Sequence, residues 1–275
     1  MENSIINSQV SPRLLRIANT ILCNYNMVYD TSLLDGKMGV CLFLYEYARH
    51  SGIKEYEDIA DEMIDLVLKI LHKGQSEDNI SRLSGIGIGV IYLITHQFLE
   101  DTDEHDSLKE LDKFLLKTIE TAMVPSEKVI HSALYFIYRF KYYRMGLDKR
   151  YCHKMAGKLI DLSRAYEDTS EKESKMWTYI LHNATLIHNA TQRTGNLHYE
   201  DHAVSHEIEQ INNQNQITAE GMWYSFFFCA ESCKISVDDD ALFYLCQNCF
   251  YDAERTIGIL CSYGLMEMNH INYTS

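Results

Sequence analysis

The feature that most constrains this chain is a glycine-containing helix start that occurs twice. Residues 34–48 read Leu-Asp-Gly-Lys-Met-Gly followed by an apolar run, and residues 83–94 repeat the pattern as Leu-Ser-Gly-Ile-Gly-Ile-Gly. Glycine inside a helix costs about 1 kcal/mol relative to alanine. Glycines that open an apolar helix therefore indicate close packing, or a cavity border, where no side chain fits. The glycines of this repeat are Gly36, Gly39, Gly85, Gly87 and Gly89.

The repeat extends along the whole chain as an alternation of two kinds of helix. Mostly apolar helices are expected to begin near residues 37, 84, 129, 176, 219 and 255, and amphipathic helices lie between them. A period of this length corresponds to one helical hairpin per repeat. Alternating buried and half-buried helices fit two concentric layers, so the sequence predicts an all-α fold, an α/α toroid of about six hairpins. We expect one domain over residues 1–275, with 1–8 disordered.

Composition narrows the partners. The chain carries 39 acidic and 25 basic side chains, a formal charge of −14, and shows no basic stretch, which argues against nucleic acid and anionic membranes as partners. No apolar run is long enough to span a membrane, and no secretory signal is recognised at the N-terminus. Eight cysteines lie scattered, several on apolar helix faces, as reduced buried thiols do. The chain is therefore expected in the cytoplasm.

The glycine motifs resemble a known family. Residues 32–40, residues 83–87 and the acidic turn 101–104 are similar to the corresponding parts of lanthionine synthetase C-like proteins, in particular short bacterial members. This resemblance implies an α/α toroid. Full members of the family cyclise precursor peptides by joining cysteine thiols to dehydrated serine or threonine. They use a zinc ion held by one cysteine and by an adjacent Cys-His pair, each in a glycine-rich turn.

The chain departs from the family at the zinc ligands. Its adjacent Cys-His pair, Cys152-His153, lies in a charged amphipathic helix, and Gly157 follows too late for the family's turn. The nearest equivalent of the other ligand segment, residues 221–224, has Tyr224 where a thiol would stand. We therefore expect no cofactor, with zinc as the alternative. The chain is interpreted as an accessory or peptide-binding protein of ribosomal peptide modification, with a peptide or protein as partner and catalytic activity left open.

Two other clusters have spacings that metal sites use. Cys229, Cys233, Cys246 and Cys249 form two close pairs, and His198, His202 and His206 recur one helical turn apart. Both patterns also arise without metal, because such spacings place thiols on buried helix stripes and histidines on a solvated face. Core cysteines and a solvated face are the interpretations that we favour.

Aromatic residues on the apolar helices are candidates for lining a cavity that holds a peptide or a sugar. The same residues also suit a filled core. Two alternatives to peptide binding follow: a carbohydrate-active barrel enzyme, which needs two carboxylates facing each other, and a protein-interaction scaffold. The residues predicted to line the cavity or bind peptide are Asp35, Tyr92, His96, His131, Trp177, His182, Trp223 and Tyr224.

Overall fold

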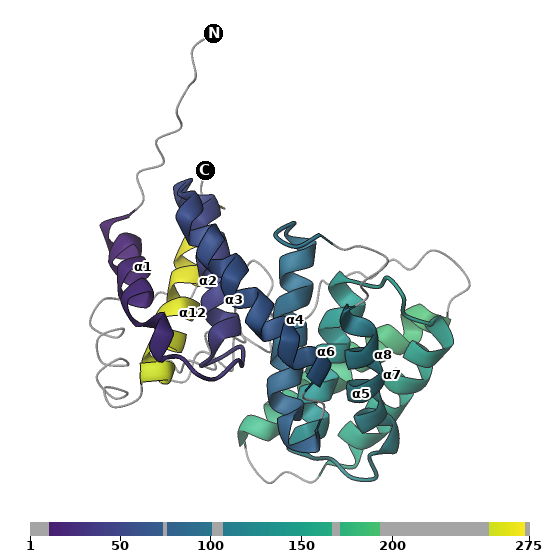
Figure 1. Cartoon of the computed structure of the whole chain (residues 1–275). Coiled ribbons are helices and arrows are strands. Elements are labelled where there is room, and N and C mark those ends of the chain that lie inside the picture. The colour runs from purple at the N-terminus through teal and green to yellow at the C-terminus, as the bar shows by residue number, and fades with distance from the viewer. Residues whose placement is uncertain (1–10, 74–75, 101–106, 167–170, 193–252, 273–275) are drawn as a thin grey trace. The chain divides into compact units, whose positions relative to one another are not determined.

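The structure, a computed structural model, describes residues 11–73, 76–100, 107–166, 171–192 and 253–272 (Figure 1). Every regular element in these residues is a helix. The all-α prediction is confirmed, and the packed helices are compatible with an α/α toroid of hairpins. The chain forms two compact units. The described part of unit 1 comprises 11–68 and 253–272, and that of unit 2 lies within 69–192.

Unit 1 combines the start of the chain with its last described helix. Its elements are α1 (Pro12–Asn24), the short 3-10 helix η1 (Tyr25–Met27), α2 (Lys37–Ser51), α3 (Lys54–Lys73), which continues into unit 2, and α12 (Ala253–Asn272). As the sequence predicts, Ser11 caps α1: its hydroxyl accepts a hydrogen bond from the Leu14 amide at 3.1 Å. Gly52, with φ +71°, ends α2 in the left-handed conformation.

Helix α12 packs against both α1 and α2. The Ser11 hydroxyl donates to a carboxylate oxygen of Glu267 in α12 at 3.1 Å. At the other end of α12, one carboxylate oxygen of Glu254 accepts hydrogen bonds from the amides of Tyr29 at 2.5 Å and Asp30 at 2.8 Å. These contacts join residues more than 220 positions apart in the sequence. Unit 1 therefore depends on α12 being in place.

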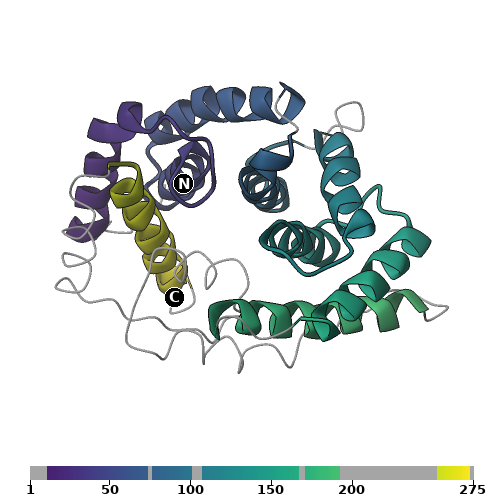
Figure 2. The same cartoon turned by 90° about the horizontal axis from the view of Figure 1, so that it is seen from below.

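Unit 2 contains the second glycine motif. Its elements are η2 (Glu77–Asn79), α4 (Ile80–Thr95), α5 (Ser107–Thr121), α6 (Glu127–Tyr142), α7 (Lys149–Arg164) and α8 (Glu171–Gln192). Helix α6 packs between α4 and α8, while α5 and α7 pack on each other and on this inner row (Figures 1 and 2). The sequence of α6 explains this inner position, because its residues 132–140 are all buried. The layers of unit 2 agree with the predicted alternation.

The second glycine motif lies elsewhere in its helix than its sequence suggests. A helix was expected over 84–99, with the glycines at its start, but α4 spans Ile80–Thr95, so Gly85, Gly87 and Gly89 lie in its interior. The buried Ile80 and Leu83 extend the apolar stripe toward the N-terminus. The apolar period likewise predicts a helix over 129–145, whereas α6 spans Glu127–Tyr142.

Three of the four cysteines in the described residues are buried: Cys41, Cys152 and Cys261, while Cys23 is exposed. The remaining cysteines, and the helices expected over 198–212, 219–234 and 241–252, lie outside the described residues. In the part of the chain that the structure describes, no helix is long and apolar enough to cross a membrane.

Candidate functional site

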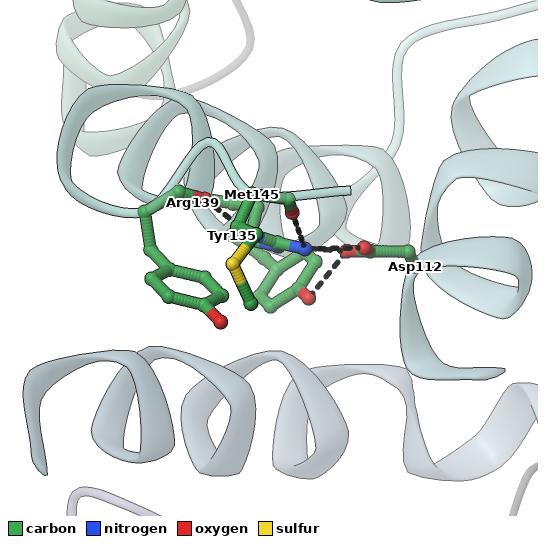
Figure 3. A network of polar contacts seen from close by, with 5 residues as sticks. Asp112, Tyr135, Arg139 and Met145 are labelled. Carbon is green, nitrogen blue, oxygen red and sulfur yellow. Dashed lines mark hydrogen bonds and ion pairs between the residues drawn. The ribbon is translucent and has the colours of Figure 1, made fainter. Parts of the chain in front are cut away.

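A polar network lies between α5 and α6 in the core of unit 2 (Figure 3). Arg139 of α6, only 1% exposed, faces Asp112 of α5: Nε lies 3.3 Å from Oδ1 and Nη2 lies 3.0 Å from Oδ2. The Tyr135 hydroxyl donates to the same Oδ1 at 2.6 Å. A two-pronged guanidinium–carboxylate pair fixes both side chains in the geometry that makes charged hydrogen bonds strongest. The network therefore locks α5 to α6.

The remaining guanidinium hydrogens hold the turn that follows α6. Arg139 Nη1 donates to the Tyr143 carbonyl, and Nη2 donates to the Met145 carbonyl at 2.9 Å. The guanidinium carbon also lies 4.7 Å from the centre of the Tyr143 ring. Burial, followed by the negative charge of Asp112, raises the pKa of the Tyr135 hydroxyl well above its ordinary value. The raised pKa keeps the hydroxyl protonated, so that it donates its hydrogen bond to Asp112.

The second glycine motif makes room for this network. A Cβ atom on Gly87 would lie 2.5 Å from a ring carbon of Tyr135 and 2.6 Å from a methyl carbon of Leu111. Real Cβ atoms do not approach neighbours so closely. Gly87 thus lets the Tyr135 ring lie against the α4 backbone while its hydroxyl reaches Asp112.

The adjacent pair Cys152–His153, which the family resemblance makes the first candidate for zinc ligands, diverges in the structure. Cys152 is 1% exposed. Burial raises the pKa of its thiol to about 12, with Asp148 and Asp112 adding to the rise and Arg139 opposing it. Neighbouring residues of a helix point about 100° apart, and His153 contacts α8 instead.

The His153 ring is committed to α8. Its Nδ1 lies 3.0 Å from the Thr191 hydroxyl and 3.3 Å from the His188 carbonyl, and its ring stacks on the His188 ring with centres 3.9 Å apart. Because a carbonyl only accepts, Nδ1 carries the hydrogen. Two parallel rings direct their nitrogens side by side rather than toward one point. Cys152, His153 and His188 therefore do not fit a shared zinc ion, which needs ligands converging at tetrahedral angles.

The first glycine motif is held by backbone and by α12. Asp35 lies where α12 crosses the motif: a Cβ on Gly258 would lie 2.8 Å from its Oδ1 and still closer to the Leu34 carbonyl. Lys37 donates from its ammonium group to the Val28 carbonyl and from its amide to the Asp30 carbonyl, the latter at 2.9 Å. Asp35 thus belongs to a tightly packed corner of unit 1.

The other predicted site residues lie mostly in unit 2. Tyr92 and His96 come together at the end of α4, with ring centres 3.9 Å apart. His131 lies 3.6 Å from the Glu127 carboxylate. Trp177 is 2% exposed and its ring is 5.8 Å from that of Tyr166, and His182 is half-buried on the same helix, α8. Trp223 and Tyr224 lie outside the described residues.

Comparison with known proteins identifies the family. The model of the lanthionine synthetase C-like proteins matches residues 27–203, more than half of the chain. The chain belongs to the lanthionine synthetase C-like family. Comparisons with curated proteins and with solved structures found no match.

The matched residues include both glycine motifs and the helices that carry the polar network. The match ends at residue 203. Sequence reasoning found the glycines but missed the role of Arg139. One signal was present: a charged residue near the end of the mostly apolar stretch 129–140. A charge in such a position needs a partner, although the sequence does not say that the partner is Asp112, 27 residues away.

Proposed function

We propose that this lanthionine synthetase C-like protein binds a peptide during ribosomal peptide modification without zinc at Cys152–His153, as an accessory rather than a cyclising protein. The observation that carries the proposal is the divergence of this pair. Cyclisation of this kind would need a metal ion, held by protein ligands, that activates the thiol of the peptide. The pair that would supply two of these ligands diverges: the Cys152 thiol is buried with a raised pKa, and His153 contacts α8.

Two buried polar atoms on α8 are candidates for peptide contacts. Among the described residues of α8, the buried atoms without a hydrogen-bond partner are Trp177 Nε1, His182 Nε2 and His188 Nδ1, and the first two belong to predicted site residues. Buried polar atoms in native proteins nearly always have one. A peptide backbone offers carbonyl and amide groups that suit both atoms, so we propose that α8 contributes to the peptide site.

Metal analysis of the purified protein tests the first half of the proposal. We expect no stoichiometric zinc that depends on this pair, so the zinc content of the wild-type protein and of the Cys152→Ser/His153→Gln variant will be the same. One zinc per chain, lost in the variant, would overturn the proposal. Zinc that is present in equal amount in both proteins would be held by other residues and would agree with the proposal for this pair.

Tryptophan fluorescence tests the second half. The chain has two tryptophans, so the Trp223→Phe variant leaves Trp177 as the reporter. Titration with the precursor peptides encoded near the gene is expected to shift the emission of Trp177, and His182→Ala is expected to weaken binding by about tenfold, the equivalent of one lost hydrogen bond to a buried group. Unchanged emission and affinity would remove α8 from the peptide site.

A further inference from the structure

The charges of this acidic protein are distributed unevenly. Residues 107–166 carry 12 basic and 6 acidic side chains, a formal charge of +6, in a chain whose total is −14. The other 215 residues carry 13 basic and 33 acidic side chains. Charge asymmetry on this scale creates a local field opposite to that of the whole protein. The expectation that the chain has no basic stretch overlooks this segment.

The basic residues form stripes on the two outer helices of unit 2. Positions four apart share one helix face. On α5 the stripe consists of Lys109, Lys113 and Lys117, and on α7 it consists of Arg150, Lys154 and Lys158. Five of these six residues are exposed, and Lys158 is partly exposed. We call these six residues the basic face.

The two stripes belong to one surface. Helices α5 and α7 pack on each other and both pack on the inner row, α5 on α4 and α6 and α7 on α8, so their exposed sides point away from that row. Lys154 of α7 forms an ion pair with Glu120 of α5, which joins the two stripes directly. Tyr151 of α7 lies near enough to Asp112 and Glu120 of α5 for both charges to raise the pKa of its hydroxyl, after the larger effect of burial.

Most carboxylates of this region are already engaged. Asp112 is paired with Arg139, Glu110 with Lys113 at 2.5 Å, and Glu120 with Lys154. Asp148 accepts the Tyr151 amide as the N-cap of α7. By contrast, three cations of the basic face make no ion pair with any described residue: Lys117, Arg150 and Lys158.

Exposed apolar side chains follow the α5 stripe. Met123 is 92% exposed and Val124 is 66% exposed, directly after the end of α5 at Thr121. A partner that combines carboxylates with apolar side chains suits this surface. A nucleic acid suits it less, because Glu110 and Glu120 interrupt the cations and repel a continuous phosphate backbone, while the chain as a whole is negative.

We propose that the basic face binds an acidic segment of the peptide partner, with its apolar residues on Met123 and Val124. This inference rests on the proposed peptide-binding function and adds the charge class of the segment and the surface that holds it. The 15 residues of α5 extend over about 22 Å. An extended peptide of about ten residues spans about 33 Å, so a short acidic segment is long enough to follow the whole α5 stripe.

Fluorescence anisotropy tests the proposal with two labelled peptides of about ten residues. In one peptide glutamate alternates with leucine, and in the other every glutamate is replaced by glutamine. We expect the acidic peptide to bind the wild-type protein more tightly than the glutamine peptide does. Added salt is expected to weaken the binding of the acidic peptide. The variant Lys117→Gln/Arg150→Gln/Lys158→Gln is expected to lose about tenfold in affinity, because each exposed charge pair contributes modestly. Met123→Ser is expected to weaken binding further.

A matched control removes three exposed cations elsewhere: Arg16→Gln/Lys54→Gln/Lys69→Gln has the same net charge as the first variant. It is expected to bind the acidic peptide like the wild type. Equal binding of both peptides, or equal losses in both variants, would overturn the basic face while peptide binding itself stands. No binding of either peptide, with no response to precursor peptides, would overturn both proposals. Tighter binding of a single-stranded oligonucleotide through the same three cations would replace the peptide by nucleic acid.

Discussion

The two glycine motifs pack against their neighbours in different ways. The first motif leads into α2, and the glycines that allow close contact there lie on the neighbouring helix, α12. The second motif lies in α4, and its own glycine allows the close contact with α6. Gly264 of α12 meets the Phe43 ring and Gly258 meets the Leu34 carbonyl. In unit 2, Gly87 of α4 meets the Tyr135 ring. The motif of unit 1 has a glycine for another reason, because a Cβ on Gly36 would collide with the backbone of Thr31 and Ser32.

Similar glycine patterns therefore make room for different kinds of neighbouring atoms in the two units. In unit 1 the nearest neighbours of Gly36 and Gly258 are backbone atoms, which cannot move aside, although Gly264 meets the Phe43 ring. In unit 2 the neighbour is an aromatic ring that is itself tied to an ion pair. The two contacts should therefore differ in how they respond to added volume and to the loss of polar partners.

The largest effect is expected from breaking the polar network of unit 2. Arg139→Met removes the guanidinium group that pairs with Asp112 and that donates to the carbonyls of Tyr143 and Met145. We expect a loss of about 3–5 kcal/mol in the free energy of unfolding, as for other broken buried pairs. Urea denaturation measures it. The double variant Asp112→Leu/Arg139→Met is expected to recover much of the loss, and a loss below about 1 kcal/mol in the single variant would show that the pair is dispensable.

Added volume is expected to cost most where the neighbour is backbone. Gly258→Ala places a methyl group against the Leu34 carbonyl and 2.8 Å from Asp35 Oδ1. We expect a loss of about 3 kcal/mol, at the upper end for overpacked sites. Gly157→Ala is the matched control, because its Cβ would meet only His188 at 3.7 Å, an ordinary contact. The control is expected to gain up to about 1 kcal/mol from helix propensity. Equal thermal stability of the two variants would contradict the contrast.

The same change in unit 2 is expected to cost less. Gly87→Ala forces the Tyr135 ring and a Leu111 methyl group to shift, and we expect a loss of about 2 kcal/mol. A double-mutant cycle with Tyr135→Ala identifies the cause, because the cost of the alanine falls once the ring is gone. If the cost is unchanged in the Tyr135→Ala background, the ring is not the obstacle.

Both units contain buried thiols, so alkaline pH is expected to lower the stability of both. Burial raises the pKa of Cys152 to about 12 and those of Cys41 and Cys261 above their ordinary value of 9.0. The unfolded chain ionises these thiols first, so stability present below pH 9 is lost as the pH rises toward the folded-state values. The slope is at most about 1.4 kcal/mol per pH unit for each thiol.

Urea denaturation between pH 8 and pH 11 measures this loss, and Cys152→Ala is expected to reduce the slope. Thiol labelling of the native protein at pH 8 gives a second readout: among the described cysteines, the exposed Cys23 is expected to react first. A pH slope that Cys152→Ala leaves unchanged would contradict the assignment.

The smallest effect concerns how the two motif helices end. Helix α2 is followed by Gly52 with φ +71°, whereas α4, which ends at Thr95, is followed by Gln97 with φ +62°, a conformation that residues other than glycine rarely adopt. The Phe98 and Gln97 amides bond to the Leu93 and Ile94 carbonyls, as in a Schellman motif. We expect Gln97→Gly to gain about 0.5 kcal/mol and Gly52→Ala to lose about 1 kcal/mol in thermal denaturation. A loss with Gln97→Gly would mean that its side chain makes a needed contact.

Local signals were enough to predict much of the fold. The cap of α1 at Ser11, the end of α2 at Gly52 and the extent of α3 follow from capping residues and from the apolar period. The start of α4 was wrong because glycines were taken as a helix start. Here packing against Tyr135 outweighs their low helix propensity, so they lie in the helix interior.

The polar network and the geometry of the candidate site were beyond the sequence for a different reason. Arg139 and Asp112 come from helices whose relative rotation no local pattern specifies. The divergence of Cys152 and His153 was partly foreseeable, because adjacent helix positions point in different directions. The cavity-lining set, from Asp35 to His182, stays a prediction that the proposed binding experiments address.

The contacts of α12 also bear on the order in which the chain folds. Helices α5 to α8 contact neighbours close in sequence, and such local contacts form early and fast. Glu254, whose carboxylate accepts hydrogen bonds from the Tyr29 and Asp30 amides, is synthesised more than 220 residues after them. During synthesis, unit 2 is therefore expected to fold before α12 covers the apolar faces of α1 and α2. Until then these exposed faces are expected to be binding sites for chaperones.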